Sequence, residues 1–502
     1  MRYLLACALL SAAATAQVTY YSAYLEPGQE VPPTASTGHG WGIVRFDAST
    51  NAVTLFAWHT GLTSGSVAAH IHQANVGING PVIVGMTAIS ADTWVGSGTL
   101  TAAQALALNT DGMYLNVHTT TFGGGEVRGQ VVRAKSTRFT AALLGTQEVP
   151  PTGSAATGTA VAFLHEPDNR VVYLVNSTGL VSVTAAHFHQ GAVGVNGPVI
   201  IPLNGSGGTY GGVSARLTPA QLTAWNADGF YCNIHTAAFG GGEIRGQMRK
   251  DAGDHFYAVC DGASETPPVP TTGIGGASLI VGPTGVITVT GQFTGLTSGA
   301  IAAHVHVGAV GVAGPVLFPL TFAGGNLSGT FTPTPADLTN LRTGQWYVNV
   351  HSSTFGGGEI RGQLLPAKLA TTYGEGCPST SGNIPHAGVS GVIAIGAPFT
   401  FDLYGVPPST FSLLFVADNR DPGPIELPVL SLAAPGCFAL ITSNLLQFTQ
   451  VSTGLGVCQQ PVPVPLTPAL RNIPLEAQWA TLDAGANPAN IVVSNALAFV
   501  IN

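Results

Sequence analysis

Six histidines of this chain stand in three pairs, and one residue separates the members of each pair. The pairs lie in "AAHIHQANVGINGPV" from Ala68, "AAHFHQGAVGVNGPV" from Ala185 and "AAHVHVGAVGVAGPV" from Ala302. A further histidine follows each pair, in "YLNVHTTTFGGGEVRGQ" and its two counterparts. Imidazole binds copper and zinc, and three such ligands leave one position open for water or substrate. The candidate metal ligands are His70, His72, His118, His187, His189, His235, His304, His306 and His351.

Strand alternation predicts how these histidines are presented. Side chains of a strand point to opposite faces at each step, so Ile71 faces the core while His70 and His72 share the outer face. In "YLNVH" the same alternation places His118 with Tyr114 and Asn116, opposite the apolar residues. The segment "TTTFGGG" can close a hairpin, which brings the third histidine near the strand "EVRGQ". A metal site and a metal-free polar cluster beneath the loop "GINGPV" both fit this pattern.

A carboxylate and a guanidinium recur on the closing strand of each unit. Only 8% of the residues are charged, yet Glu126 and Arg128 stand two residues apart and therefore share a face. We expect Arg128 to be at least partly buried under the turn "VGINGPV", with Glu126 near the histidines, where a carboxylate could orient an imidazole. A structural salt bridge fits better than a catalytic role. The expected supporting residues are Glu126, Arg128, Glu243, Arg245, Glu359 and Arg361.

The motifs belong to an internal repeat that organises most of the chain. His72, His189 and His306 are 117 residues apart, and "QEVPP", "QEVPP" and "SETPP" open the three units. Such a period, with motifs in the same order, is typical of tandem domains. We place the units at 17–135, 136–251 and 252–368. A fourth region, 369–502, lacks the pattern and is predicted to be a separate module.

The elements within a unit are mostly strands. Segments such as "VVYLVNSTGL" are rich in β-branched and aromatic residues and end at glycine. One short helix is expected before the closing hairpin, with Thr218 and Thr334 as N-caps and Pro219 and Pro335 at the first helical position. The prediction is an all-β protein. Each repeat would be a β-sandwich or Greek-key barrel, and the C-terminal module a small β-sandwich.

Composition and the N-terminus indicate an exported protein. "MRYLLACALLSAAATAQ" has a basic residue, an apolar run and an A-x-A pattern, so residues 1–16 are expected to be a signal peptide. No later run is long and apolar enough for a transmembrane segment. The net charge is −8, and no basic patch is visible, which argues against nucleic acid as a partner. The predicted location is secreted or at the cell surface.

Export allows disulfides, so the cysteines of this chain are candidates for pairing. Cys377 and Cys437 both follow turn sequences, so we predict a bond between them. Cys232 and Cys260 form a second candidate pair, which would leave Cys458 unpaired. His59, His165 and His255 have no counterparts in the other units and are read as surface or ordinary packing residues.

The three units resemble CHRD domains, a module first described in chordin and frequent in secreted bacterial proteins. The residues that carry the resemblance are "QEVPP", "AAHIHQANVGINGPV" and "YLNVHTTTFGGGEVRGQ" with their replicates, over roughly residues 20–368. The resemblance implies an extracellular module without established catalytic activity. Chordin binds growth factors, but the cysteine-rich modules for that ligand have no match here. The C-terminal region resembles a terminal domain of secreted bacterial proteins.

The histidine set is also similar to that of copper/zinc superoxide dismutase. By that resemblance His70, His72 and His118 match copper ligands, and Arg128 matches the active-site arginine. The ligands of the zinc loop have no match, because "PVIVGMTAISADTWVGSGTL" contains no histidine. The resemblance therefore does not imply dismutase activity. It is compatible with a site that binds copper alone or with a vestigial site.

These observations predict a secreted extracellular binding or structural protein whose partner is an unknown extracellular protein or surface component. The alternative is a copper- or zinc-dependent redox or hydrolytic protein with three equivalent sites. Whether the chain is an enzyme stays open at this point.

Overall fold

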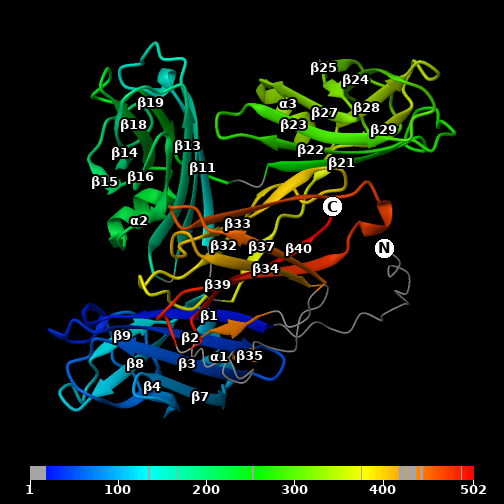
Figure 1. Ribbon diagram of the computed structural model, residues 1–502. Coiled ribbons are helices and arrows are strands. Elements are labelled where there is room, and N and C mark those ends of the chain that lie inside the picture. The colour runs from blue at the N-terminus through cyan, green and yellow to red at the C-terminus, as the bar shows by residue number, and fades with distance from the viewer. Residues whose placement is uncertain are drawn as a thin grey trace. The chain divides into compact units, whose positions relative to one another are not determined.

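The protein is described by a computed structural model that covers residues 18–133, 136–166, 168–251, 254–374, 376–417, 425–426, 437–440, 445–487 and 489–502 (Figure 1). The expected signal peptide lies outside the described residues. The chain divides into two compact units, one up to Ala134 and one from Lys135 onward. The first unit holds the first repeat, and the second holds the other two repeats and the C-terminal module.

The first repeat consists of two antiparallel sheets and one short helix. The larger sheet has the order β10-β1-β2-β3-β7-β6 and the smaller one β5-β4-β8-β9. The elements are β1 (Val18–Leu25), β2 (His39–Asp47), β3 (Ala52–Thr60), β4 (Ser66–Gln73), β5 (Val82–Gly85), β6 (Thr87–Ala88), β7 (Thr93–Thr99), α1 (Ala102–Asn109), β8 (Met113–Thr119), β9 (Val127–Gln130) and β10 (Val132–Arg133).

The second repeat has the same strand order, but its two halves join into one ten-stranded, barrel-like sheet through the pairing of β19 with β11. Its elements are β11 (Ser136–Leu144), β12 (Thr157–His165), β13 (Arg170–Thr178), β14 (Val183–Gln190), β15 (Val199–Pro202), β16 (Gly205–Ser206), β17 (Thr209–Val213), α2 (Pro219–Asn226), β18 (Phe230–Thr236), β19 (Ile244–Gln247) and β20 (Arg249–Lys250).

The third repeat closes in the same way, through the pairing of β29 with β21. Its elements are β21 (His255–Asp261), β22 (Ile274–Val281), β23 (Ile287–Thr294), β24 (Ala300–Val307), β25 (Val316–Pro319), β26 (Thr321–Ala323), β27 (Asn326–Phe331), α3 (Pro335–Arg342), β28 (Trp346–Ser352), β29 (Ile360–Gln363) and β30 (Leu365–Pro366). The prediction of an all-β protein with three tandem repeats is confirmed.

Short helices precede the closing hairpins, as the sequence predicted. Thr218 and Thr334 are N-caps, and each accepts a hydrogen bond from the backbone N–H three residues on. Pro219 and Pro335 occupy the first helical position. The first repeat uses Thr101 in the same capping box, without the proline. Because the caps satisfy backbone groups that would otherwise lack partners, helices of only eight residues can form.

A separate apolar core fills each repeat, and the strands bearing the histidines supply part of it. Ile71 of β4 and Val117 of β8 are fully buried in the core of the first repeat, beside Leu55 and Leu108. Phe188 and Val305 take the place of Ile71 in the other repeats. Burial of this face fixes the register of β4 and β8, since a slip of one residue would turn the histidines inward.

The C-terminal module packs two sheets against a shared core that includes Phe401, Leu414, Trp479 and Leu497. Five strands have the order β31-β40-β39-β34-β37, three have the order β32-β33-β38, and β35 pairs with β36. The strands are β31 (Thr371–Tyr373), β32 (His386–Gly391), β33 (Pro398–Tyr404), β34 (Phe411–Ala417), β35 (Ile425–Glu426), β36 (Phe438–Ala439), β37 (Leu446–Val451), β38 (Val457–Pro463), β39 (Pro474–Leu482) and β40 (Ile491–Val500).

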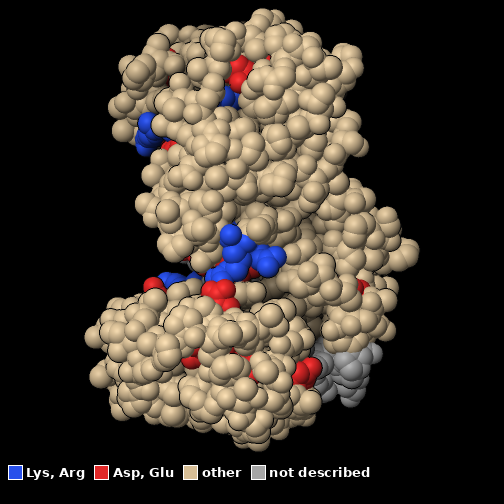
Figure 2. All heavy atoms as spheres, turned by 90° about the vertical axis from the view of Figure 1, so that its left-hand side faces the viewer, with Lys and Arg blue, Asp and Glu red and all other residues tan. Residues whose placement is uncertain are grey.

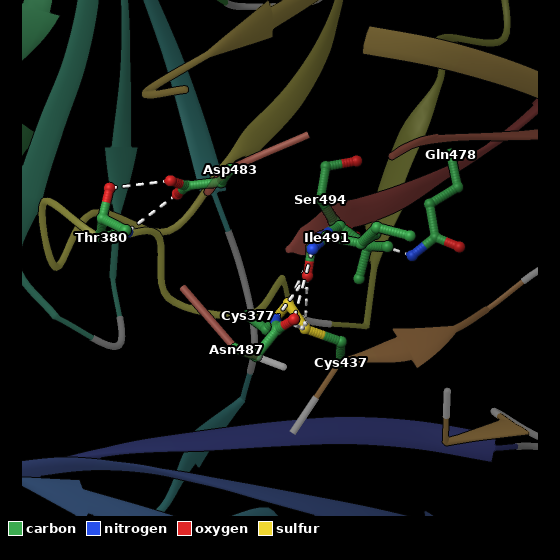
Figure 3. The surroundings of a disulfide bond; sticks show 9 residues. Cys377, Thr380, Cys437, Gln478, Asp483, Asn487, Ile491 and Ser494 are labelled. Atoms are coloured by element: carbon green, nitrogen blue, oxygen red, sulfur yellow. Dashed lines mark hydrogen bonds between the residues drawn. A yellow bond between two sulfur atoms is a disulfide. The ribbon is translucent and has the colours of Figure 1, made fainter. Parts of the chain in front are cut away.

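One disulfide joins Cys377 to Cys437 in this module, the pair expected from the sequence (Figure 3). Asn487 donates a hydrogen bond to the carbonyl of Ile491 beside it. The second candidate pair is wrong, because Cys232 and Cys260 are both free thiols. Each is buried in the apolar core of a different repeat, so neither can reach the other. Cys458 is free and buried as well, as expected.

The surface carries few charges. Figure 2 shows one face, on which Lys, Arg, Asp and Glu are sparse among uncharged residues. Among the described residues, no helix is long and apolar enough to cross a membrane.

Candidate metal centre

Two neighbouring strands present the histidines of each repeat on one face. In the first repeat β4 pairs with β8, so that His70 lies opposite Asn116, His72 opposite Tyr114, and Ala68 opposite His118. The same register recurs between β14 and β18 and between β24 and β28. The structure thus brings the three histidines of each repeat together, with every candidate ligand in the place that alternation assigns to it.

The ligand nitrogens converge closely. In each triad one nitrogen per histidine can be chosen so that all three lie within 4.8 Å of one another. The Nδ1 atom of His70 is 3.2 Å from Nε2 of His118, and the corresponding distances in the other repeats are 3.2 and 3.1 Å. Two nitrogens bound tetrahedrally at metal distances of ~2.0–2.1 Å would be about 3.3 Å apart. The two imidazoles make a hydrogen bond at this distance, and the same spacing also suits a shared ion.

Backbone carbonyls set the tautomers of two histidines in each triad. The Nδ1 atom of His72 is 3.0 Å from the carbonyl oxygen of Gly80, and that of His118 is 3.0 Å from the carbonyl oxygen of Gly123. Since a carbonyl can only accept, each Nδ1 carries the proton and each Nε2 keeps its lone pair. Backbone carbonyls hold these imidazoles, rather than the carboxylate that the sequence suggested. The equivalent bonds are present in the other two repeats.

One of these nitrogens is buried and has no partner. Nε2 of His72 makes no hydrogen bond, and the same is true of His189 and His306. Each of these residues is only 8% exposed. Buried polar atoms without partners are rare, and a free lone pair in a cluster of three imidazoles is a candidate ligand position. The other two histidines of the first triad are partly exposed, so the site can be reached from solvent.

An arginine–tyrosine stack supports the buried histidine. The ring of Tyr114 lies parallel to that of His72, with centroids 4.7 Å apart and planes 7° apart. The guanidinium carbon of Arg128 is 3.3 Å from the centre of the same tyrosine ring. The imidazole and the guanidinium both lie too close to the Tyr114 ring to occupy the same face of it. They therefore lie on opposite faces of the ring. Equivalent stacks contain Arg245 over Tyr231 and Arg361 over Tyr347.

Arg128 is buried under the loop that follows β4, as the sequence predicted, with an exposure of 1%. It donates to the side-chain oxygen of Asn79 and to the carbonyl oxygen of Asn75. Arg245 makes the same two kinds of bond. In the third repeat Ala313 takes the place of the asparagine, and Arg361 donates instead to Thr266 and to a loop carbonyl.

Glu126 anchors loops, and the salt bridge with Arg128 that the sequence suggested is not formed, because each side chain is taken up by other partners. Its carboxylate accepts hydrogen bonds from Ser36, Thr63 and Thr119, and Glu359 accepts from the matching residues Thr271 and Thr297. Burial raises the pKa of Glu126, but these hydrogen bonds together lower it below its usual value. The carboxylate therefore stays ionised and holds the loops beside the hairpin.

The sequence did not predict a second buried carboxylate, that of Glu30. Glu30 lies in the motif "QEVPP" that opens the unit, and it accepts hydrogen bonds from Asn116. Burial raises the pKa of Glu30 from 4.5 to about 7, against the opposing charge of Arg128. Glu148 behaves alike, with a pKa of about 7, and the pKa of Glu265 is also raised by burial. The recurrence of the glutamate in all three opening motifs was the available signal.

The histidines outside the triads lie inside the protein rather than on its surface. His59, His165 and His255 are 5%, 8% and 5% exposed. His59 contacts the hydroxyl of Ser66, and Nδ1 of His165 is 2.7 Å from Asp168. His165 also lies beside His386 of the C-terminal module, and Nε2 of His255 is 3.4 Å from Asp251 at the end of the second repeat. The buried positions agree with the expectation of packing roles and correct that of surface positions.

The environment of the first triad favours neutral histidines. Burial lowers the pKa of His70, His72 and His118 below the usual value, and the neighbouring imidazoles lower it further for His70 and His72. In the second repeat burial, with the charges of His235 and His189, lowers the pKa of His187 to about 4. Neutral imidazole is the form that binds metal ions.

Comparisons with known proteins agree with the repeat architecture. A search of curated proteins found no relative. Among solved structures, the chain is similar to trypsin-activated alpha-2-macroglobulin from Escherichia coli, at 8% identity and a TM-score of 0.15. That match covers 90% of this chain but only 30% of the other, and a likeness so weak carries no argument. The CHRD domain family matches residues 21–131, 139–248 and 256–364, which is more than half of the sequence. The chain therefore belongs to the CHRD domain family, with three copies of the domain.

Proposed function

We propose that the protein is a secreted binding protein that holds one transition-metal ion in each CHRD domain. The observation that carries the proposal is the buried, unpartnered Nε2 of His72, His189 and His306, in a triad whose ligand atoms lie within 4.8 Å of one another. Three neutral nitrogen ligands suit copper or zinc and leave one coordination position open. The ligands would be His70, His72 and His118, with their equivalents in the other two domains.

This chain's own residues would do three things around such an ion. The carbonyls of Gly80 and Gly123 fix the tautomers of two ligands. The hydroxyl of Tyr114 accepts a hydrogen bond from the Gly80 backbone, so the ring that stacks on His72 also holds the loop that orients it. The bound ion would supply Lewis acidity at its open position. Binding thus needs little rearrangement of the strands.

Metal content per chain tests the proposal. We expect the purified full-length protein, dialysed against copper or zinc and then against buffer, to retain about three ions per chain. Replacement of His72 by Ala should lower the content by one ion, and the triple change with His189→Ala and His306→Ala should abolish it. Replacement of His59 by Ala, outside the triads, is the control. Less than half an ion per chain in the unaltered protein would reject the proposal.

Redox catalysis is a second candidate because the proposed ion keeps an open position. The position of Arg128 weighs against dismutation, since the ring of Tyr114 separates its guanidinium from His72. A dismutase arginine must reach a small anion at the metal. We therefore place binding ahead of catalysis.

A further inference from the structure

The tip of each closing hairpin carries glycines that the fold does not require. A Cβ atom added at Gly123 or Gly124 would meet nothing within 4 Å, and neither residue has a positive φ. The next glycine differs, because Gly125 has a φ of +126° and its Cβ would meet Asn116 at 2.4 Å. The pairs Gly240–Gly241 and Gly356–Gly357 repeat the bare tip in the other domains. The space above these tips is open in all three copies.

The bare tip adjoins the triad. The carbonyl of Gly123 accepts the hydrogen bond of His118, so the tip lies directly beside one ligand. An ordinary side chain would fit there sterically, and it would reduce the conformational freedom of the unfolded chain. The glycine pairs recur in all three repeats without a conformational reason, and they leave the space beside each triad open.

Exposed aliphatic side chains border the same sites. Val82 of β5 lies opposite His72 in the strand pairing and is 50% exposed. Val76 and Ile78 lie on the loop whose carbonyl holds that histidine, and they are 73% and 57% exposed. We call this set and its equivalents the apolar rim. Its members are Val76, Ile78, Val82, Val193, Val195, Val199, Val310, Val312 and Val316.

Charge is absent from the segments that carry the three histidine pairs. No Lys, Arg, Asp or Glu occurs between Val67 and Ala91, between Val181 and Ala215, or between Ile301 and Ala336. Behind the site, Glu126 is taken up by Ser and Thr donors, and Glu30 lies against Asn116. A divalent ion held by three neutral imidazoles would therefore keep its whole charge at the open position. An anionic oxygen donor from outside would balance it.

We propose that each metal-loaded triad binds a small organic carboxylate with an apolar body. One carboxylate oxygen replaces water at the open coordination position, and the apolar body lies against the apolar rim in the space left by the glycine tip. This inference rests on the proposed function, because the carboxylate needs the ion. The binding is reversible coordination with no change of oxidation state.

Hexanoate is the probe, tested on full-length protein loaded with Co²⁺, whose visible absorption reports a change of ligand. Metal content is measured first, so failure to load would overturn the metal proposal, and this inference with it, before any carboxylate is added. On loaded protein we expect hexanoate to shift the spectrum and to bind at least tenfold more tightly than acetate, because it buries additional methylene groups. Hexanol should leave the spectrum unchanged. Equal affinity for acetate and hexanoate, or no shift with either, would overturn the inference.

Substitution of the bare glycines separates the ligand site from the metal site. The triple variant Gly124→Leu, Gly241→Leu, Gly357→Leu should retain its metal and lose at least fivefold in hexanoate affinity, while its acetate affinity changes little. Gly454→Leu is the matched control, since a Cβ there also meets nothing within 4 Å and the residue lies in the C-terminal module. Unchanged hexanoate binding by the triple variant would show that the tips take no part.

Discussion

Single residues decide whether each triad can hold an ion, and Arg128 is the one on which the surroundings depend most. It is buried in a chain with few charges, and it stacks on Tyr114 while it donates to the loop that orients His72. Loss of one partner from a buried charged network leaves the remaining polar groups without partners. Its role is to hold the loop and the tyrosine in place.

We predict that Arg128→Ala destabilises the first unit by about 3 kcal/mol, the scale found when a buried charged network loses one member. The measurement is equilibrium unfolding of the first unit, residues 18–134, produced by itself. Arg133→Ala is the control, because Arg133 is exposed and lies in the same unit. A loss below about 0.5 kcal/mol, as for ordinary surface changes, would contradict the structural role and favour a binding role.

Glu30 gives a prediction about pH. Its folded pKa of about 7 lies above the ordinary value of 4.5, so between these values the folded state holds a proton that the unfolded state has released. Stability contributed by the protonated carboxyl is therefore lost as pH rises from about 4.5 to 7. Glu30→Gln should remove this loss, so that the variant gains on the order of 3 kcal/mol relative to wild type across that window. If the difference in unfolding free energy between Glu30→Gln and the wild type does not change with pH, the prediction is wrong.

At the scale of elements, the closing hairpin joins the triad to the rest of the repeat. Gly125 is the residue that the hairpin needs, since its positive φ and the 2.4 Å approach of Asn116 exclude a side chain. We predict that Gly125→Ala lowers the stability of the first unit by more than 2 kcal/mol, because strain and displacement of the Asn116–Glu30 pair add together. Gly124→Ala, one residue away, should change it by less than about 0.5 kcal/mol. Similar losses for the two variants would show that the tip is constrained as a whole.

The sequence predicted the strands and faces of the site because both depend on local rules. Alternation around Ile71 and Val117 placed the three histidines on one face, and threonine followed by proline marked the helix starts. The partners of those side chains depend on tertiary contacts instead. The carbonyl that holds His72 comes from a loop, and Glu30 reaches Asn116 from 86 residues away. The pairing of Cys232 with Cys260 failed because apolar burial in separate cores outweighed the oxidising context.

At the scale of the whole molecule, three copies of one site stand in one chain. The repeats differ in detail, since Ala313 removes the asparagine that the other two loops use, yet each triad keeps its geometry. Each repeat also has its own core, so one site does not need the others in order to form. Metal ions should therefore bind to the three repeats independently. Substitution of a ligand histidine in one repeat should leave the metal sites of the other two occupied.

The disulfide tests whether the sites depend on the C-terminal module, which packs on the second repeat at Phe163 and on the third at Tyr257. It closes a loop of 60 residues far from any triad residue in the sequence, and it is buried within the C-terminal module. Loss of a cross-link of that length costs about 4 kcal/mol in the chain-entropy model, because the unfolded chain gains freedom. We predict that the double variant Cys377→Ser, Cys437→Ser lowers the unfolding temperature of the C-terminal module, measured by calorimetry. The unfolding transition of the first unit should stay in place, and metal content should remain at the wild-type level. A parallel loss of metal would mean that the module stabilises the sites, and this prediction would then be wrong.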